Sequence, residues 1–578
     1  MNNSHPGILA VRAINQYRRR DVLTYLGLRY YLNNAAARTD QWAKQIAPDI
    51  VMTRTDSPYF NALHFKESTP DGKVDHRQIA LPGANEALAE AALLEECTNF
   101  PQLFNNPDCV FSYELNSGHD RGGIFKPYFG GLKKRHQAIA GACDANQNGV
   151  VRYTDIKRFY PSISVDLALD AWRRMANSGN IHVRYRELGE KLIDEHGKFE
   201  NKKSILTGPM FSHFLGNLIL RKLDQECSKS LPARYFRYVD DITLVGDAGA
   251  VAHSLSLIRD RLAQLGLNLH EDSSPKSIEV STDEWLKGRN DFHDVRPKIS
   301  WATLIGDLKR FLLCNLKERG NLCEAFRNEG FRIPVLDYTG AVYESSYLER
   351  LRDLVRQSWF RRKSQVVTIQ TLIDQAKYLQ KTYKVEFQNL LDGAGELDYF
   401  NRKRRVPKLR FFAGRMIYLA TDETLALLSP MASELPELNF HAVVMDAVAS
   451  GNIDRLLSLG TNAAQAAAQP MKAANKQATT TLLQFSEAEE QALAVFFLNG
   501  VAVKRDEQTP VLSSELMSFA ISGVDIDLMK SSKSFMREIA CFHGLGRPRH
   551  ADMLETVFDK DESLAMDAIE QLQQSTSL

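Results

Sequence analysis

The spacing of hydrophobic and polar residues along the chain changes character near residue 295. Before it, short runs of aromatic and β-branched residues, which are typical of strands, alternate with longer runs whose apolar positions recur at helical spacing. After it, strand signals nearly vanish. The helical runs there span residues 301–318, 344–363, 367–391, 408–420, 440–459, 484–498, 511–520 and 549–573. The pattern predicts an α+β first half followed by an all-helical second half.

Helical spacing also occurs within the first half. It predominates over residues 1–74 and returns over 86–96, 166–196 and 251–265. A Gly-rich stretch, residues 118–131, leads into the basic run Lys133-Lys134-Arg135. We interpret it as a loop whose cations either contact phosphate groups or are solvated.

A pair of adjacent acids interrupts the strand-like run at residues 234–246. Aromatic and β-branched residues flank Asp240 and Asp241, and this arrangement predicts a tight hairpin turn with both acids at its tip. Two carboxylates this close repel each other, so either one takes a proton or both face a cation. A solvated Asp pair is the alternative if this stretch is considered alone.

Two further segments carry candidate chemistry. Residues 150–155 have a strand pattern that ends in Asp155, and residues 204–217 run from a Gly-Pro loop into a helix. If the fold brings Asp155 to the Asp240–Asp241 turn, three carboxylates converge. Such a group suits two Mg²⁺ ions, with Mn²⁺ as an alternative, that activate a 3′-hydroxyl and stabilise a leaving pyrophosphate.

Composition narrows the class of protein. The 578 residues are 44% hydrophobic and 25% charged with a net charge of +1, so nucleic-acid binding would depend on local basic patches. The seven cysteines form no CxxC pair, which argues against zinc and disulfides and suits a reducing compartment. The sequence has no secretion signal and no apolar stretch of about 18 residues. We expect a cytoplasmic protein with no membrane partner.

Taken in order, these segments resemble the motifs of reverse transcriptases. Residues 155–163 (Asp-Ile-Lys-Arg-Phe-Tyr-Pro-Ser-Ile) look like the first catalytic motif, residues 207–217 like the second, and Tyr238-Val-Asp-Asp241 like the third. Residues 265–276 are similar to a fourth motif, whose lysine lies near the triphosphate. Thr207 departs from the pattern, since glutamine usually precedes the motif glycine. The resemblance covers residues 75–290 and implies the fingers and palm of a right-hand polymerase.

The resemblance also implies roles for single residues. Asp155, Asp240 and Asp241 would be the catalytic acids and metal ligands, with the backbone carbonyl of Ile156 as a further ligand. Deoxynucleoside triphosphates would be the substrates and DNA the product. The implied nucleotide-binding residues are Ile156, Phe159, Tyr160, Gly208, Ser212, Asn217 and Lys276.

Tyr160 bears on the choice of sugar. An aromatic ring five positions after the first acid leaves no room for a ribose 2′-hydroxyl, whereas relatives that make RNA carry an acid there. We therefore predict that the protein uses deoxynucleotides. The alternative is that Tyr160 is only a core aromatic residue beside Phe159.

The predicted domains are an N-terminal helical extension (1–74), the fingers and palm (75–290), and an all-helical thumb-like and HEAT-like repeat region (291–578). A divergent palm before a long helical half resembles the bacterial defence-associated reverse transcriptases, including the abortive-infection type. This resemblance implies phage defence, homo-oligomers, and DNA synthesis without a template or on a noncoding RNA. It also implies priming from a protein hydroxyl in some members.

Basic residues in the second half suggest a nucleic-acid contact. One group lies beside Phe411 and Phe412, and a second surrounds Trp359. Cations beside rings suit a single-stranded nucleic acid, although a solvated helix face would show the same pattern. The first group consists of Arg402, Lys403, Arg404, Arg405, Lys408 and Arg410.

Two other functions remain open at this point. One is a conventional templated reverse transcriptase of a retron-like retroelement. The other is a catalytically idle module that binds RNA or a phage protein. The three intact acids disfavour the second, because a purely structural palm has no use for them.

Overall fold

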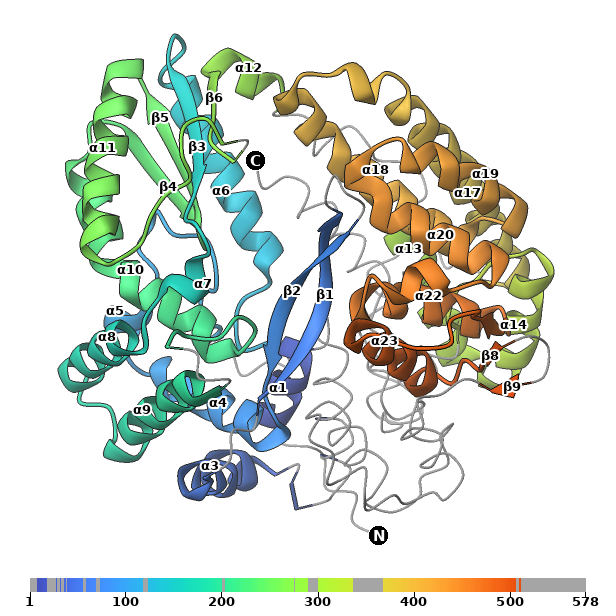
Figure 1. Cartoon of the computed structure of the whole chain (residues 1–578), viewed down its shortest axis with the longest axis horizontal. Coiled ribbons are helices and arrows are strands. Elements are labelled where there is room, and N and C mark those ends of the chain that lie inside the picture. Colours follow the sequence, from blue (N-terminus) through green and yellow to red (C-terminus); the bar gives the residue numbers. More distant parts are fainter. Residues whose placement is uncertain are drawn as a thin grey trace. The chain divides into compact units, whose positions relative to one another are not determined.

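The structure is a computed structural model (Figure 1), and its described residues form two compact units. The first comprises residues 1–61 and 79–294, and the second comprises residues 62–78 and 295–577. The described residues are 8–17, 28, 32, 36–37, 39–55, 59–68, 73–117, 123–199, 203–274, 276–288, 300–335, 367–505 and 509–510.

A four-stranded antiparallel sheet lies at the centre of the first unit, in the order β4-β5-β3-β6. Strand β3 (Val150–Asp155) pairs with β5 (Asp241–Gly246) on one side and with β6 (Ile278–Ser281) on the other. Strand β4 (Arg234–Tyr238) pairs with the outer side of β5. The predicted strand that ends at Asp155 is confirmed.

Helices cover both faces of this sheet. Helix α11 (Ala248–Gln264) lies on one side and α6 (Tyr128–Asp144) on the other (Figure 1). The Asp247 side chain caps α11 by accepting a hydrogen bond from the backbone N–H of Ala250. The basic run that we predicted as a loop lies inside α6, because Arg135 packs inward, where its guanidinium lies 5.5 Å from the Tyr153 ring centre.

The remaining helices of the first unit surround α10 (Met210–Ser230), whose predicted start after the Gly-Pro loop is confirmed. The predicted helix over 166–196 is two helices, because the first ends at Ser178 and the second begins at Val183. The other helices of this unit are α1 (Ile8–Tyr17), η1 (Trp42–Ile46), α3 (Ala47–Thr53), α4 (Ala84–Cys97), α5 (Pro101–Phe104), α7 (Phe159–Ser162), α8 (Val165–Ser178), α9 (Val183–Lys198) and α12 (Thr282–Lys287).

The prediction of a helical extension over residues 1–74 is wrong in its last part. Strand β1 (Phe60–Ser68) forms a two-stranded sheet with β2 (Val74–Leu81). Local spacing did not indicate a strand there. Residues 60–68 form one because they pair with β2, and a strand is stable only with such a partner.

The second unit is mainly helical around one hydrophobic core, as predicted. Short strands β7 (Ala478–Thr479), β8 (Val503–Arg505) and β9 (Thr509–Pro510) are the exception. The helices predicted over 344–363, 511–520 and 549–573 lie outside the described residues. The helices of this unit are α13 (Trp301–Cys314), η3 (Leu316–Glu318), α14 (Arg319–Asn328), α17 (Ile369–Leu391), η5 (Ala394–Glu396), α18 (Tyr399–Leu419), α19 (Asp422–Ser433), η6 (Pro436–Leu438), α20 (Asn439–Ser450), α21 (Asp454–Leu457), α22 (Thr461–Ala473) and α23 (Glu487–Leu498).

The β1–β2 hairpin is anchored in this helical unit. The backbone N–H groups of Leu63 and Phe65 donate to the side chains of Gln491 (2.9 Å) and Asn462 (3.0 Å). Gly460 has a φ of 87°, and a side chain there would collide with the Leu63 carbonyl oxygen. An early segment of the chain is therefore part of the later folding unit.

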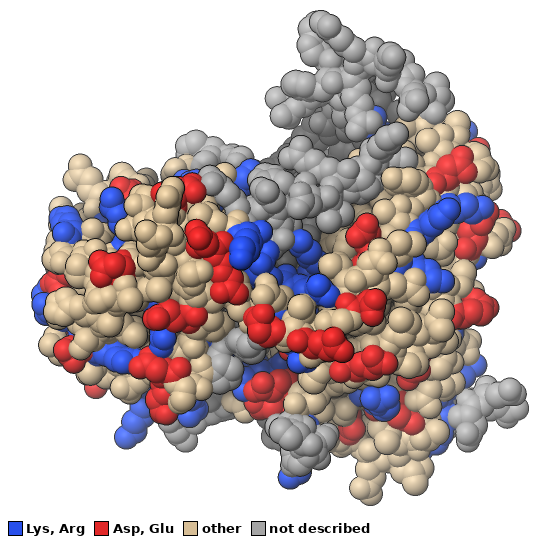
Figure 2. Space-filling model, turned by 90° about the horizontal axis from the view of Figure 1, so that it is seen from above, with Lys and Arg blue, Asp and Glu red and all other residues tan. Residues whose placement is uncertain are grey.

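Both basic and acidic side chains occur on the visible surface. Figure 2 shows basic and acidic side chains interspersed over most of the face that it displays, in keeping with the net charge of +1. Among the residues that the structure describes, no helix has the length and apolar character needed to cross a bilayer.

Candidate active site

Three carboxylates from separate segments meet at one edge of the central sheet. Asp155 is the last residue of β3 and lies opposite Asp241, the first residue of β5. Asp240 precedes it in the turn between β4 and β5. Each of the three offers an oxygen within 4.8 Å of the others. The predicted convergence of the three acids is confirmed.

The turn itself differs by one residue from the predicted one. Tyr238 pairs with Asp241, so Val239 and Asp240 are the two central residues and Asp241 already belongs to a strand. Val239 has a φ of 57°, which is unusual for a β-branched side chain. A strained residue of this kind persists only where its surroundings hold it.

Hydrogen bonds to both backbone groups of Val239 hold the turn. Its N–H donates to the Ser112 hydroxyl (2.8 Å), and its carbonyl accepts from the Arg237 guanidinium (2.6 Å). In addition, the backbone N–H of Ile156 donates to the carbonyl of Asp240 at 3.2 Å. These contacts fix the Asp240 backbone against the end of β3.

Arg237 depends in turn on Asp224 of α10. The two side chains have no exposed surface and form a bidentate pair at 2.8 and 2.7 Å. Burial opposes the charged form, but the Asp224 carboxylate raises the pKa of Arg237 above its usual value. The Tyr235 hydroxyl donates to the same carboxylate at 2.9 Å. A buried, fully paired ion pair of this kind fixes orientation more than it adds stability.

Asn217 links the same elements. Its side-chain amide donates to the carbonyl of Ser112 (2.8 Å), and its oxygen accepts from Arg237 (3.2 Å). The resemblance implied that Asn217 is one of the nucleotide-binding residues. The structure places it in the network beneath the turn, where it connects α10 to β4.

The electrostatics of the three acids reflect their crowding. Desolvation, together with the neighbouring Asp241 and Asp155 carboxylates, raises the pKa of Asp240 well above its usual range. Burial and the nearby Asp241 carboxylate also raise the pKa of the Tyr153 hydroxyl. A cation at this position would relieve the repulsion among the acids.

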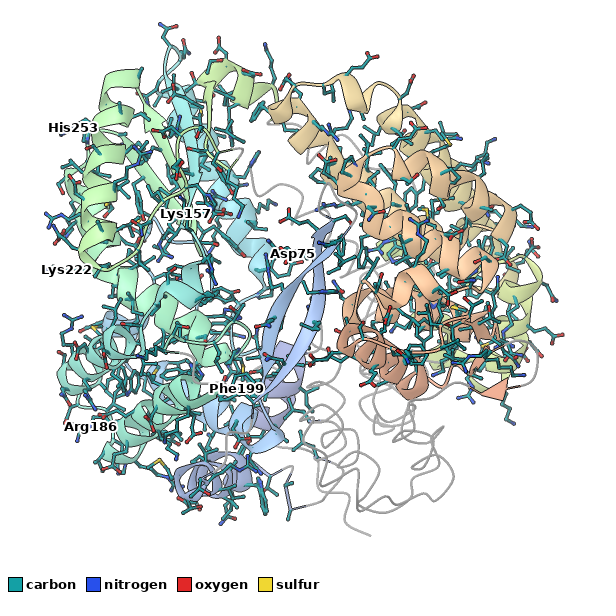
Figure 3. All side chains as sticks on the ribbon, in the orientation of Figure 1. Asp75, Lys157, Arg186, Phe199, Lys222 and His253 are labelled. Atoms are coloured by element: carbon teal, nitrogen blue, oxygen red, sulfur yellow. The ribbon has the colours of Figure 1, made fainter. Side chains whose placement is uncertain are left out.

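Lys276 lies beside the acids, and the role near a triphosphate that the resemblance implied for it stays a prediction. Its ammonium group donates to Asp155 Oδ2 at 3.0 Å, and Nε2 of His270 lies 3.9 Å from the same oxygen. Burial and the nearby Lys276 charge lower the pKa of His270. Lys157, labelled in Figure 3 just after β3, pairs with Glu271 at 2.9 Å.

The residues present fit a divalent metal. All three donors are carboxylates, which hard cations such as Mg²⁺ prefer. Oδ1 of Asp155 is buried and has no hydrogen-bond partner, although a buried carboxylate oxygen is normally satisfied. Asp155, Asp240 and Asp241 are therefore the candidate metal ligands, with the Ile156 carbonyl remaining a prediction.

The predicted nucleotide-binding residues differ in their surroundings. Phe159 is buried, whereas Tyr160 is partly exposed and its hydroxyl lies 2.6 Å from Nδ1 of His213. Gly208 has a φ of 128°, and a Cβ there would collide with the Ala80 carbonyl, so only glycine fits.

Ser212 does not line an open surface as the resemblance implied. The residue is fully buried in α10, and its hydroxyl has no hydrogen-bond partner. The reason is that Ser212 faces the core side of the helix, which the motif alone does not specify.

The predicted nucleic-acid-binding group in α18 is partly engaged in packing. Arg402 pairs with Glu437 at 2.9 Å, and Arg410 donates to the Glu437 carbonyl at 3.0 Å. Arg405 donates to the carbonyl of Asp392 at 3.0 Å, beyond the end of α17. These arginines thus bind ends of neighbouring helices.

The rings beside this group are not available for stacking on bases. Phe411 and Phe412 lie in the hydrophobic core with 6% and 1% of their surface exposed. The Arg404 guanidinium lies over the Phe400 ring, 5.9 Å from its centre. Lys408 lies on the same helix, whereas the side chain of Lys403 and the group around Trp359 lie outside the described residues.

Several residues of the site were missed from the sequence. Arg135, Asp224, Arg237 and His213 are buried polar residues that fix its geometry. A signal existed for Arg237, because it shares the inward alternation of β4 with Tyr235. The other three lie on helices, where spacing alone does not identify their partners.

Comparisons with models of known protein families and with curated proteins found no match to this chain. The functional assignment therefore depends on the geometry of the acids and on the motif resemblance.

Proposed function

We propose that this chain is a reverse-transcriptase-type DNA polymerase, which joins deoxynucleotides by a two-metal mechanism. The observation that carries the proposal is the meeting of Asp155, Asp240 and Asp241, with oxygens within 4.8 Å, at the end of two paired strands. The order of the motifs along the chain supports it independently.

The chain's own residues would position the metal ions and the triphosphate and would exclude ribonucleotides. The three carboxylates would hold the ions, which when bound supply charge stabilisation for the attacking hydroxyl and the leaving pyrophosphate. Lys276 provides a cation beside the acids, where a triphosphate needs one. The Tyr160 ring would exclude a ribose 2′-hydroxyl. Little further chemistry is required, since phosphoryl transfer is catalysed mainly by positioning and electrostatics.

The biological role that we propose is phage defence in the bacterial cytoplasm. It follows from the resemblance to defence-associated reverse transcriptases, which combine such a palm with a helical second half. The same resemblance supports a homo-oligomer and synthesis on a noncoding RNA or without a template. The basic group from Arg402 to Arg410 is the proposed contact for that RNA or the DNA product. Several of its arginines already bind other residues of this chain.

One assay tests the activity directly. Purified protein is incubated with Mg²⁺ and each dNTP, with and without its co-purified RNA, and the product is resolved by length. Product without added template or primer supports defence-type synthesis. Template-dependent product supports a conventional retroelement enzyme instead.

The controls identify the site. Asp155→Asn and Asp240→Asn are expected to reduce the rate at least about a hundredfold, as when one charge-stabilising group is removed from an active site. Asp247→Asn changes the same charge but keeps the α11 cap, and it should leave the rate unchanged. Absence of any product from folded wild-type protein would overturn the proposal.

A further inference from the structure

His213 of α10 is in direct contact with the proposed sugar-discriminating residue. Its Nδ1 lies 2.6 Å from the Tyr160 hydroxyl, and the two rings meet edge to face with centres 5.2 Å apart. Only 4% of the His213 surface is exposed. Since Tyr160 is partly exposed, the hydrogen bond is shielded from water on its histidine side only.

The His213 ring is itself fixed. It stacks on the Tyr113 ring with an interplanar angle of 5° and a centre distance of 4.3 Å. Tyr113 in turn contacts Phe125 edge to face at 5.3 Å and has a φ of 48°, an uncommon backbone conformation. The stack restricts rotation of the imidazole and so fixes the direction of Nδ1.

The next turn of α10 confines the Tyr160 ring from another side. Gly216 lies three residues after His213 and therefore on the same helix face. A Cβ at Gly216 would lie 2.9 Å from the Phe159 ring and 3.6 Å from the Tyr160 ring. Helix α10 thus offers a glycine surface against which Tyr160 packs and a histidine that holds its hydroxyl.

We propose that His213 is a positioning residue for sugar selection, which holds the Tyr160 ring where it blocks a ribose 2′-hydroxyl. The inference rests on the proposed polymerase function. Excluding one oxygen atom requires that the ring cannot swing away, and a tyrosine held only by packing retains freedom about its side-chain bonds. The hydrogen bond at the distal end of the ring removes that freedom.

The test is the ratio of kcat/KM for a dNTP to that for the matching rNTP. His213→Phe keeps a ring on Tyr113 but loses the hydrogen bond, and Tyr160→Phe removes the same bond from the other side. Each is expected to lower the ratio about fivefold to tenfold, mainly through faster rNTP incorporation. The double variant should be no worse than either single variant, because both remove one interaction.

Two matched variants distinguish a positioning role of His213 from a purely structural one. His213→Asn retains a side-chain group that can bond the Tyr160 hydroxyl and should restore most of the ratio. His253→Phe, on the exposed face of α11 (Figure 3), is the same exchange away from the site and should change nothing.

The outcomes distinguish the two proposals. If folded wild-type protein incorporates no dNTP, the proposed function fails. If wild-type protein polymerises and both His213→Phe and Tyr160→Phe keep its ratio, the positioning role of His213 is overturned while the polymerase proposal stands. Should His213→Phe fail to fold, Tyr160→Phe and His213→Asn decide the question.

Discussion

The Lys276 ammonium group lies 3.0 Å from the Asp155 carboxylate, although the two residues are 121 positions apart in the sequence. Lys276 follows the segment that pairs with the end of β3, where Leu269 bridges to Ile156. The pairing brings the lysine to the acids and gives Asp155 a cationic partner. The same carboxylate cannot bind this lysine and a metal equally well.

Lys276 should therefore compete with a divalent ion. Lys276→Met is expected to tighten Mn²⁺ binding about fivefold, which corresponds to the ~1 kcal/mol of a partly exposed ion pair. Isothermal titration calorimetry measures this. Lys222→Met, on the exposed side of α10 (Figure 3), is the control and should bind as wild type does. Unchanged or weaker binding by Lys276→Met would contradict the competition.

Gly216 should not tolerate a methyl group. Gly216→Ala places a Cβ 2.9 Å from the Phe159 ring, and overpacking of this kind is expected to cost about 1–3 kcal/mol of unfolding free energy. Displacement of Phe159 and Tyr160 should also lower dNTP incorporation. Urea unfolding and the polymerase assay measure the two effects.

The matched control for that substitution is Gly141→Ala in α6. No atom lies within 4 Å of a Cβ built there. Alanine should stabilise the protein by about 0.4–1 kcal/mol, since it reduces the freedom of the unfolded chain. Equal effects at the two glycines would show that the Phe159 contact is unimportant.

Removing one member of the buried Arg237–Asp224 pair should be severe. Arg237→Met leaves an uncompensated carboxylate with no exposed surface, and we expect a loss of about 3–5 kcal/mol in unfolding free energy. Asp224→Leu combined with Arg237→Met should cost much less than the two single losses added together. Chemical denaturation of the four proteins measures the coupling.

A surface pair provides the comparison. Arg173 and Glu190 form an ion pair at 2.5 Å with 50% and 37% of their side-chain surface exposed. Arg173→Met is expected to cost at most about 1 kcal/mol, because solvent screens the pair. A similar loss at both arginines would argue against a special role for the buried pair.

Because of Glu90, the free energy of unfolding should depend on pH. It is fully buried in α4 and accepts hydrogen bonds from the Tyr17 hydroxyl (3.3 Å) and the Phe211 backbone N–H (3.1 Å). Burial raises its pKa from 4.5 to about 8. Between these values the folded protein holds a proton that the unfolded chain releases, so stability should fall as pH rises through this window.

The size of this effect should be on the order of a few kcal/mol between pH 5 and pH 8. Glu90→Gln removes the titration and should gain stability relative to wild type as pH rises. The exposed Glu187→Gln should show no such trend. Urea unfolding of the three proteins at both pH values measures it, and parallel pH profiles for wild type and Glu90→Gln would refute the prediction.

Local pattern was sufficient for most of the elements of the first unit. The strand ending at Asp155, the helix after the Gly-Pro loop and the helix over 86–96 are confirmed because each is determined by neighbouring residues. The basic loop predicted at 133–135 is wrong because Arg135 pairs with groups of the sheet, which its own neighbours do not indicate. Strand β1 was missed for the same reason, since the side chains that anchor it, Gln491 and Asn462, lie about 400 positions later in the chain.

The sequence by itself determined which side chains were available, because three acids within recognisable motifs were sufficient to predict that Asp155, Asp240 and Asp241 meet. Only the tertiary structure decided how those acids are held in place. The strained Val239 turn, the Arg237–Asp224 pair and the stacked His213 ring all depend on contacts between distant segments. Such contacts have no local signature, because burial and pairing arise only when the chain has folded.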